Sequence, residues 1–242
     1  MNAIETQALT KRYGSRTAVD RLDLTVRQGE LFALLGVNGA GKTTTIKMLC
    51  GLSAPSGGDA LLLGRSVVRA PQTVKRIIGV SPQETAVARN LTVRENLELV
   101  AGVFGAARAD ARRRAGELME AFGLGTCAAQ RAKTLSGGMQ RRLSIAMALI
   151  SAPQILFLDE PTLGLDVLAR RELWKHIEAL RGTVTVILTT HYLEEAEALS
   201  DRMAVMAAGR LRAVGTADEL KRLTGTDRFE DAFIRLATEE NT

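Results

Sequence analysis

The sequence predicts an α/β fold built around a mostly parallel β-sheet. Three short apolar runs support this prediction, because each has the length of a strand buried on both faces and each lies beside residues with helical periodicity. These runs are Leu31–Leu35, Ile155–Asp159 and Thr183–Thr190. Strands that alternate with helices favour parallel pairing. At 242 residues, the chain is long enough for one domain with subdomains.

Two subdomains are expected beside this core. Residues 1–83 and 152–215 are predicted to contain the sheet core together with an antiparallel β subdomain. Its short strands lie within residues 1–30 and 57–64, since Leu22–Val26 alternates apolar and polar side chains. Residues 84–151 are predicted to be an inserted α-helical subdomain, and residues 216–242 a short helical tail.

The helical insertion shows where its helices start and which faces they bury. Thr92 and Glu95 have the spacing of a capping box. Four apolar residues then follow along one helical face: Val93, Leu97, Val100 and Phe104. A second helix carries the basic triplet Arg112–Arg114, which is expected to face solvent, and ends near Gly123.

A glycine-rich loop joins the run 31–35 to the helix that follows it. Its pattern is Gly-x-x-x-x-Gly-Lys-Thr, the P-loop pattern, which turns backbone N–H groups toward a polyphosphate at the positive end of a helix. Lys42 reaches the β- and γ-phosphates, and the Thr43 hydroxyl is a ligand for Mg²⁺. The residues predicted to hold the nucleotide here are Gly36, Val37, Asn38, Gly39, Ala40, Gly41, Lys42, Thr43 and Thr44.

Polar side chains end two of the buried runs, at the sheet edge where loops form a ligand crevice. Asp159 suits water-mediated contact with Mg²⁺, and Glu160 is placed to polarise a water for in-line attack on the γ-phosphate. His191 follows the run 183–190, where an imidazole can hydrogen-bond the γ-phosphate and orient Glu160. His176 is expected on a helix, at its surface or in packing.

Gln83 and Tyr13 are further candidates for the same site. Gln83 follows an apolar strand that Pro82 ends, and an amide there can touch Mg²⁺ and the attacking water. The alternative for Gln83 is a solvated loop side chain. Tyr13 offers an aromatic face on which adenine can stack, and its alternative is an ordinary aromatic on an edge strand.

A second phosphate-binding helix end is predicted at Leu135-Ser136-Gly137-Gly138. Ser136 is a hydroxyl N-cap, and Gly137 and Gly138 leave bare backbone N–H groups at the positive end of a helix that runs to Leu149. Because one chain needs only one triphosphate cradle, this helix end is expected to serve the nucleotide held by another copy. An ordinary capped helix is the alternative.

Taken in this order, the motifs resemble the ATP-binding cassette of ABC transporters, and the resemblance covers nearly all of residues 3–236. It implies a P-loop NTPase (RecA-like) core, ATP and Mg²⁺ as cofactors, and an ATP hydrolase. In this family two cassettes sandwich two ATP molecules head to tail, and Asp166 matches the loop that crosses their interface. His191 matches the switch histidine of the family. The implied catalytic residues are Glu160, His191 and Gln83, and the implied metal ligands are Thr43, Gln83 and Asp159.

Within the family, three segments look like the ATPase subunits of ABC-2 type exporters, which move drugs, lipids or polysaccharides outward. These segments are Leu91–Leu97, Leu135–Met139 and Thr189–Ala196. The resemblance implies two partners, a second ABC ATPase chain that is expected to be identical and a separate polytopic membrane permease. It places the chain at the cytoplasmic face of the cell membrane. Met139 replaces the Gln often found in this motif, and activity is expected to survive that change.

Composition excludes some other classes. The formal net charge is +5, yet Arg112–Arg114 is the only basic triplet, so nucleic acid is not expected as a partner. Cys50, expected in a helix, and Cys127, expected in a loop, fit reduced thiols. The amino-terminal residues lack the pattern of a signal peptide, and the longest apolar stretch, residues 143–152, is too short to span a bilayer.

The alternative function is a soluble ABC ATPase that acts on ribosomes or DNA. Translation-type members usually carry two cassettes, and repair-type members separate the two phosphate-binding motifs by a long coiled coil. This chain has one cassette and no heptads between Lys42 and Ser136, which opposes both types. The sequence does not predict the cargo or the permease, because the membrane partner recognises the cargo. It also leaves a homodimer and a heterodimer open.

Overall fold

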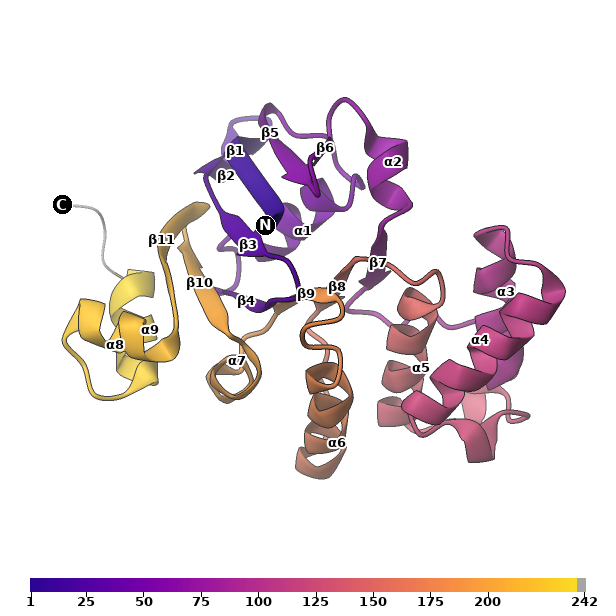
Figure 1. Cartoon of the computed structure of the whole chain (residues 1–242). Coiled ribbons are helices and arrows are strands. Elements are labelled where there is room, and N and C mark those ends of the chain that lie inside the picture. Colours follow the sequence, from indigo (N-terminus) through magenta and orange to yellow (C-terminus); the bar gives the residue numbers. More distant parts are fainter. Residues whose placement is uncertain (239–242) are drawn as a thin grey trace.

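The computed structural model describes residues 1–238, so the last four residues of the expected helical tail lie outside the described part. Two β-sheets stack against each other, and helices cover the outer face of the larger sheet (Figure 1). A group of three helices, α3, α4 and α5, extends at one end of the molecule, and α8 and α9 lie at the opposite end beside β10 and β11. The loop that joins β4 to α1 lies between these two ends.

The larger sheet has six strands in the order β11-β10-β4-β9-β8-β7. All neighbouring pairs are parallel except β10 and β11, which are antiparallel. The prediction of a mostly parallel core is therefore confirmed. The strands are β4 (Leu31–Leu35), β7 (Ile78–Ser81), β8 (Ile155–Asp159), β9 (Thr185–Thr189), β10 (Arg202–Ala207) and β11 (Arg210–Gly215).

The second sheet is antiparallel, as predicted for the β subdomain. Its strands are β1 (Asn2–Tyr13), β2 (Arg16–Leu22), β3 (Thr25–Arg27), β5 (Gly57–Leu62) and β6 (Arg65–Ser66). The single strand expected over 22–26 is wrong, because β2 ends at Leu22 and β3 begins at Thr25. Both strands pair antiparallel with β1, and the pairing is interrupted between them, where Leu24 N donates to the Thr6 hydroxyl at 2.8 Å and Asp23 accepts from Ala8 N at 2.6 Å.

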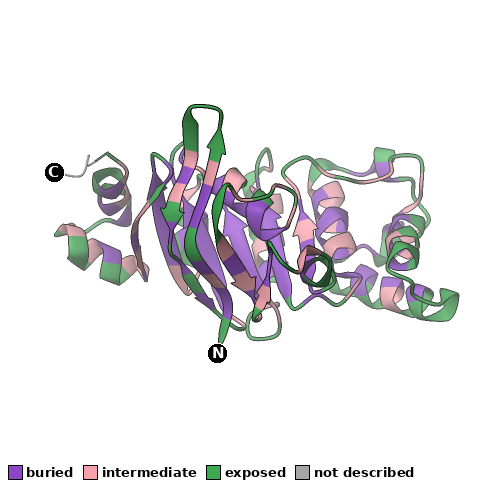
Figure 2. Ribbon diagram, turned by 90° about the horizontal axis from the view of Figure 1, so that it is seen from above, coloured by how far each residue is buried: buried purple, intermediate pink, exposed green. Residues whose placement is uncertain are grey.

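The central strands are buried on both faces because their side chains alternate between two apolar cores. In β4, Leu31 and Leu35 pack into the core under the helices, whereas Phe32 and Leu34 pack into the core between the sheets. The strands of the larger sheet are mostly buried, whereas those of the antiparallel sheet mix buried and exposed residues (Figure 2). Each such Phe or Leu contributes roughly 1.5–3 kcal/mol to stability relative to an exposed position.

Nine α-helices are described within residues 1–238, and a short one, α2, was not predicted. They are α1 (Lys42–Leu49), α2 (Pro71–Lys75), α3 (Val93–Val103), α4 (Arg108–Ala121), α5 (Gly137–Leu149), α6 (Val167–Glu178), α7 (Leu193–Leu199), α8 (Ala217–Thr224) and α9 (Phe229–Thr238). Two turns of 3₁₀ helix, Gly125–Cys127 and Ala132–Thr134, lie between α4 and α5. No helix in this range is long and apolar enough to cross a membrane.

The start of the helical insertion is as predicted. The Thr92 hydroxyl accepts from Glu95 N at 3.1 Å and Glu95 Oε2 accepts from Thr92 N at 2.7 Å, which is a complete capping box. Phe104 departs from the expected apolar face, because it caps the end of α3 and is 51% exposed. In α4, Arg112 and Arg113 are exposed, in agreement with the predicted solvated side, whereas Arg114 is half-buried.

Both cysteines are free and buried. Cys50 caps the end of α1 instead of lying inside the helix, and Cys127 belongs to a 3₁₀ turn instead of an irregular loop. His176 is a packing residue on α6, where its ring stacks on Phe122 with centroids 5.2 Å apart.

Candidate functional site

The P-loop connects the end of β4 to the start of α1, and close backbone contacts explain its glycines. Gly41 is the N-cap of α1 with a φ of 107°, a conformation that L side chains rarely adopt. A Cβ at Gly41 would lie 2.6 Å from the carbonyl oxygen of Ala18, and one at Gly36 would lie 2.5 Å from that of Met206. Larger residues would therefore push the loop away from β2 and β10.

Lys42 is buried at the start of α1, and its ammonium donates to the carbonyl oxygen of Gly36 at 2.7 Å. Burial lowers the pKa of Lys42, and the negative charges of Glu160 and Asp159 oppose this shift. The cation is thus held inside the loop and faces the two acids. A polyphosphate in the loop would supply the negative charge that the buried ammonium lacks.

Asp159 and Glu160 end β8 in two different environments. The Asp159 carboxylate is buried and accepts from the Thr189 hydroxyl at 2.5 Å, across from the end of β9. Glu160 has a φ of 49°, and its N–H donates to the Thr189 hydroxyl and to the Thr189 carbonyl, both at 3.1 Å. A left-handed conformation at a non-glycine residue costs of order 1–3 kcal/mol and is found mainly at functional sites.

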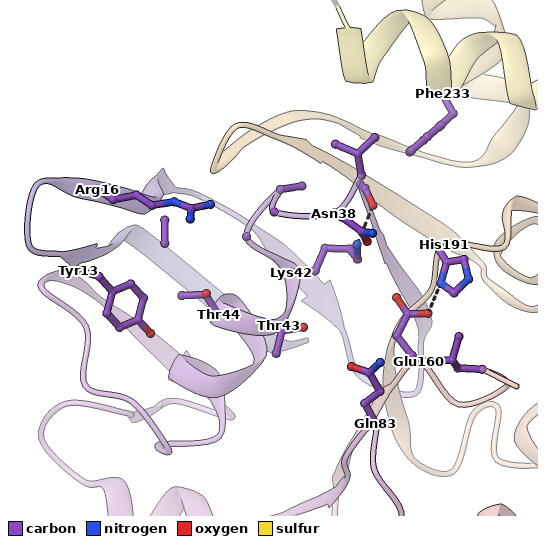
Figure 3. Close-up of a pocket in the computed structure, with 17 residues that line it drawn as sticks. Tyr13, Arg16, Asn38, Lys42, Thr43, Thr44, Gln83, Glu160, His191 and Phe233 are labelled. Atoms are coloured by element: carbon purple, nitrogen blue, oxygen red, sulfur yellow. Dashed lines mark hydrogen bonds and ion pairs between the residues drawn. The ribbon is translucent and has the colours of Figure 1, made fainter.

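His191 and Glu160 form a direct pair. His191 Nδ1 lies 2.7 Å from Glu160 Oε2 (Figure 3), and the side chains are 41% and 12% exposed, respectively. An ionised carboxylate can only accept a hydrogen bond, so Nδ1 carries the hydrogen of this contact. The pair therefore holds the Glu160 carboxylate in one orientation at the edge of the sheet.

The predicted P-loop and catalytic residues surround one pocket of about 970 Å³. Most predicted site residues line it: Tyr13, Gly36, Val37, Asn38, Gly39, Ala40, Gly41, Lys42, Thr43, Thr44, Gln83, Glu160 and His191. Figure 3 shows Thr43, Gln83 and Glu160 on one side and Tyr13 on the other. Tyr13 is 51% exposed at the end of β1, with the Lys11 ammonium 5.0 Å from its ring centroid. It is thus open to a flat group such as adenine.

Five predicted site residues do not line this pocket: Asp159, Ser136, Gly137, Gly138 and Asp166. Asp159 is the buried last residue of β8. Ser136 is the N-cap of α5, where its hydroxyl accepts from Met139 N at 3.3 Å, and Asp166 is the N-cap of α6, where it accepts from Ala169 N at 2.9 Å. A Cβ on Gly138 would lie 3.2 Å from the Ala169 Cβ, so these two caps are neighbours.

The sequence did not single out Arg141, a residue of α5 that hydrogen-bonds the backbone of the segments carrying the site residues. Arg141 is 4% exposed, and its guanidinium donates to the carbonyl oxygens of Asp159 at 2.7 Å, Pro161 at 2.8 Å and Gln83 at 3.2 Å. Burial lowers the pKa of Arg141 to about 10, against the pull of Asp159 and other acids. Arg141 therefore ties α5 to the loops that carry Gln83 and Glu160.

Other residues that line the pocket also escaped the sequence analysis. Arg16 and Ala18 come from β2, Leu163 follows Glu160, and Phe233 reaches the pocket from α9. None belongs to a pattern with a fixed spacing from the P-loop, so only the fold reveals them. No cluster of three or more His, Cys, Asp or Glu side chains that could bind a metal occurs within residues 1–238.

Comparison with known proteins gives consistent results. A family model described as ABC transporter matches residues 19–163. The chain is 47% identical to the daunorubicin/doxorubicin resistance ATP-binding protein DrrA of Streptomyces peucetius, over 98% of this chain and 73% of that protein.

Two solved structures share the fold. One, described as the ATP-binding subunit of an ABC transporter, has a TM-score of 0.86 at 30% identity and covers 97% of this chain and 99% of its own. The other is the dimeric structure of MJ0796, a bacterial ABC transporter cassette, with a TM-score of 0.79 at 25% identity, covering 88% and 98% of the two chains.

Proposed function

This chain belongs to the ABC transporter family, and from that premise we propose that it is the ATP-hydrolysing subunit of an exporter whose membrane subunit is a separate chain. The chain binds ATP and hydrolyses it, as ABC ATP-binding proteins do to power transport. The observation that carries the proposal is one pocket that combines the P-loop, Lys42 and the Glu160–His191 pair.

The roles of the site residues follow from their chemistry. Glu160 accepts the proton of the attacking water, and His191 holds the carboxylate in place through Nδ1. Lys42 leaves the Gly36 carbonyl to contact the β- and γ-phosphates, since phosphate oxygens are charged acceptors and form the stronger hydrogen bond. Tyr13 stacks on the adenine, and Gln83 contacts the attacking water from the loop after β7.

The donor set at this end of the sheet fits Mg²⁺. Thr43, Gln83 and Asp159 offer a hydroxyl, an amide and a carboxylate oxygen, and a hard cation that retains its waters prefers oxygen ligands. A magnesium ion held there would neutralise charge on the phosphates. Asp159 is already fixed by its hydrogen bond from Thr189, so its carboxylate would not need to reorient.

The functional unit that we propose is a head-to-tail dimer of identical chains. Ser136 and Gly137 lie at the exposed start of α5 and Asp166 at the exposed start of α6, outside the pocket of their own chain. The N-terminus of α5, with a neutral Ser136 cap, is suited to phosphate recognition, and Asp166 lies at the neighbouring helix start. In a head-to-tail dimer they would contact the nucleotide in the pocket of the second copy.

The membrane partner and the cargo follow from the relatives. DrrA is named for resistance to daunorubicin and doxorubicin, so we propose a drug-like cargo. As in other members of the family, the path of the cargo would be formed by a separate polytopic permease. The chain would then bind that permease at the cytoplasmic face of the membrane.

The Glu160→Gln substitution tests the catalytic assignment. The amide keeps the size of the side chain but cannot accept a proton, so phosphate release should fall by roughly 100-fold or more. ATP should still bind, and closed dimers should accumulate. Phosphate release and light scattering with ATP measure the two effects, with Glu178→Gln, an exposed residue at the end of α6, as control. Unchanged turnover would remove Glu160 from its role.

The identity of the partner tests the exporter assignment. We would purify the tagged chain from detergent-solubilised membranes at near-native abundance and identify stoichiometric companions by mass spectrometry. A polytopic membrane protein is the expected companion. Recovery of soluble partners alone, such as ribosomal proteins, would favour the soluble ABC ATPase instead.

A further inference from the structure

His191 is more exposed than its catalytic partner, so something must hold its ring. The hydrogen bond to Glu160 restrains the ring only at Nδ1, on a side chain that is 41% exposed. The Tyr192 ring packs against the imidazole, with centroids 4.2 Å apart and planes at 38°. Aromatic pairs at this distance attract each other beyond simple burial. The imidazole is thus restrained at one face as well as at Nδ1.

Arg170 contacts Tyr192 in turn. Its guanidinium carbon lies 5.2 Å from the centroid of Tyr192 and 5.8 Å from that of Trp174, so the cation lies over both aromatic rings. Arg170 Nε is buried and has no hydrogen-bond partner within residues 1–238. Burying a polar group in this way is costly unless other contacts compensate, and the two rings provide cation–π contacts.

The backbone N–H groups of Tyr192 and Arg170 are both hydrogen-bonded to residues near the site. Tyr192 N donates to the Thr190 hydroxyl at 3.0 Å, directly after β9. Arg170 N donates to the carbonyl oxygen of Asp166 at 2.9 Å, in the first turn of α6. Neither Tyr192 nor Arg170 lines the nucleotide pocket; both line a second pocket of about 720 Å³, and His191 lies between the two.

We propose that Tyr192, held by Arg170, is a positioning residue that keeps the His191 imidazole oriented toward the Glu160 carboxylate. This inference rests on the catalytic roles proposed above. Arg170 and Tyr192 together, here called the clamp, also connect the first turn of α6, which follows the Asp166 cap, to the His191–Glu160 pair. A displacement of the Asp166 loop is passed through Arg170 and Tyr192 to the imidazole.

The clamp should affect turnover and leave ATP binding unchanged, because neither residue reaches the nucleotide pocket. In the Tyr192→Leu chain, kcat should fall by about five-fold while KM for ATP stays constant. Arg170→Leu should have a smaller effect of the same kind. Tyr192→Phe keeps the ring and should restore turnover. Arg171→Leu, an exposed neighbour on α6, is the matched control for Arg170.

Two results would overturn the proposal. One is an unchanged kcat, or a raised KM, in Tyr192→Leu. The other is an equal loss from Tyr192→Leu in a His191→Ala background, because a residue that acts through His191 should have no further effect once the imidazole is gone.

A spectroscopic measurement separates this inference from the catalytic assignment. The chain has only two histidines, so the ring protons of His191 can be followed by NMR in the full chain, with His176 as internal reference. The ring current of Tyr192 should shift the His191 signals, and Tyr192→Leu should abolish that shift even without ATP. A shift that survives the substitution would refute the stack. If Tyr192→Leu abolishes the shift but Glu160→Gln leaves turnover unaltered, the catalytic assignment is refuted and the stacking of Tyr192 on His191 stands.

Discussion

Glu195 is a carboxylate on α7 that the fold removes completely from solvent. Oε1 accepts from the Trp174 indole N–H at 3.0 Å, which joins α7 to α6. Burial raises the pKa of Glu195 above its ordinary value of 4.5, although the hydrogen bond from Trp174 opposes the rise. The folded state therefore holds this proton more tightly than the unfolded chain does.

The tighter binding of a proton by Glu195 in the folded state should make the unfolding free energy depend on pH. Because the folded pKa is raised, the contribution of Glu195 is most favourable below pH 4.5 and is lost as pH rises through the folded pKa. The glutamine side chain of the Glu195→Gln variant cannot titrate. The unfolding free energy of this variant, relative to that of wild type, should therefore increase as pH rises and should level off above the folded pKa of Glu195. Urea unfolding from about pH 5 to about pH 8 measures this. Glu194→Gln, its exposed neighbour, is the control; parallel profiles for Glu195→Gln and wild type would contradict the prediction.

Single residues differ in how far the sequence reveals them. The residues of the P-loop, Glu160 and His191 follow motifs whose spacing reflects their chemistry, and the structure brings them to one pocket. Arg141 does not, because it stands next to Arg142 in a helical pattern that allows either to be buried. Only the packing of α5 against the ends of β7 and β8 turns Arg141 inward.

Elements were predicted best where local chemistry decides their ends. The capping box at Thr92 and the cap at Ser136 are confirmed, because each side chain bonds its own helix. The single strand expected over 22–26 was wrong because Asp23 and Leu24 form hydrogen bonds with Ala8 and Thr6 of β1. The local sequence does not predict these contacts with a distant segment. Phe104 was assigned to the buried face because periodicity continues past the point where α3 ends.

Two helix caps allow the structural and functional roles of Ser136 to be separated. Ser136 caps α5, and Thr216 caps α8 with a full capping box. Alanine at either position should lower the unfolding free energy by about 1 kcal/mol, measured by urea unfolding. Only Ser136→Ala should also lower ATP turnover, by about ten-fold or more, since its hydroxyl is proposed to contact phosphate. Equal turnover in the two variants would leave Ser136 with a capping role alone.

At the scale of the whole molecule, the proposed dimer divides each active site between two chains. The P-loop pocket and the start of α5 would then belong to different sites. Lys42→Ala damages the pocket. Gly137→Asp places a negative charge where a phosphate of the second copy would bind, and a Cβ on Gly137 meets nothing within 4 Å, so the chain itself can accommodate the change. Each variant alone should therefore be nearly inactive as a homodimer.

Mixing these two inactive chains distinguishes a shared site from a site within one chain. In a mixed dimer, the intact pocket of the Gly137→Asp chain meets the intact α5 of the Lys42→Ala chain, whereas the other site carries both defects. About half of the dimers should be mixed and half of their sites intact, so about a quarter of wild-type turnover should return if the sites work independently. Cooperation between sites would lower this recovery. Phosphate release by the mixture, compared with that of each variant at the same total concentration, is the measurement. A mixture as inactive as its components would count against the head-to-tail arrangement, because it would show that no intact site forms when the two chains combine.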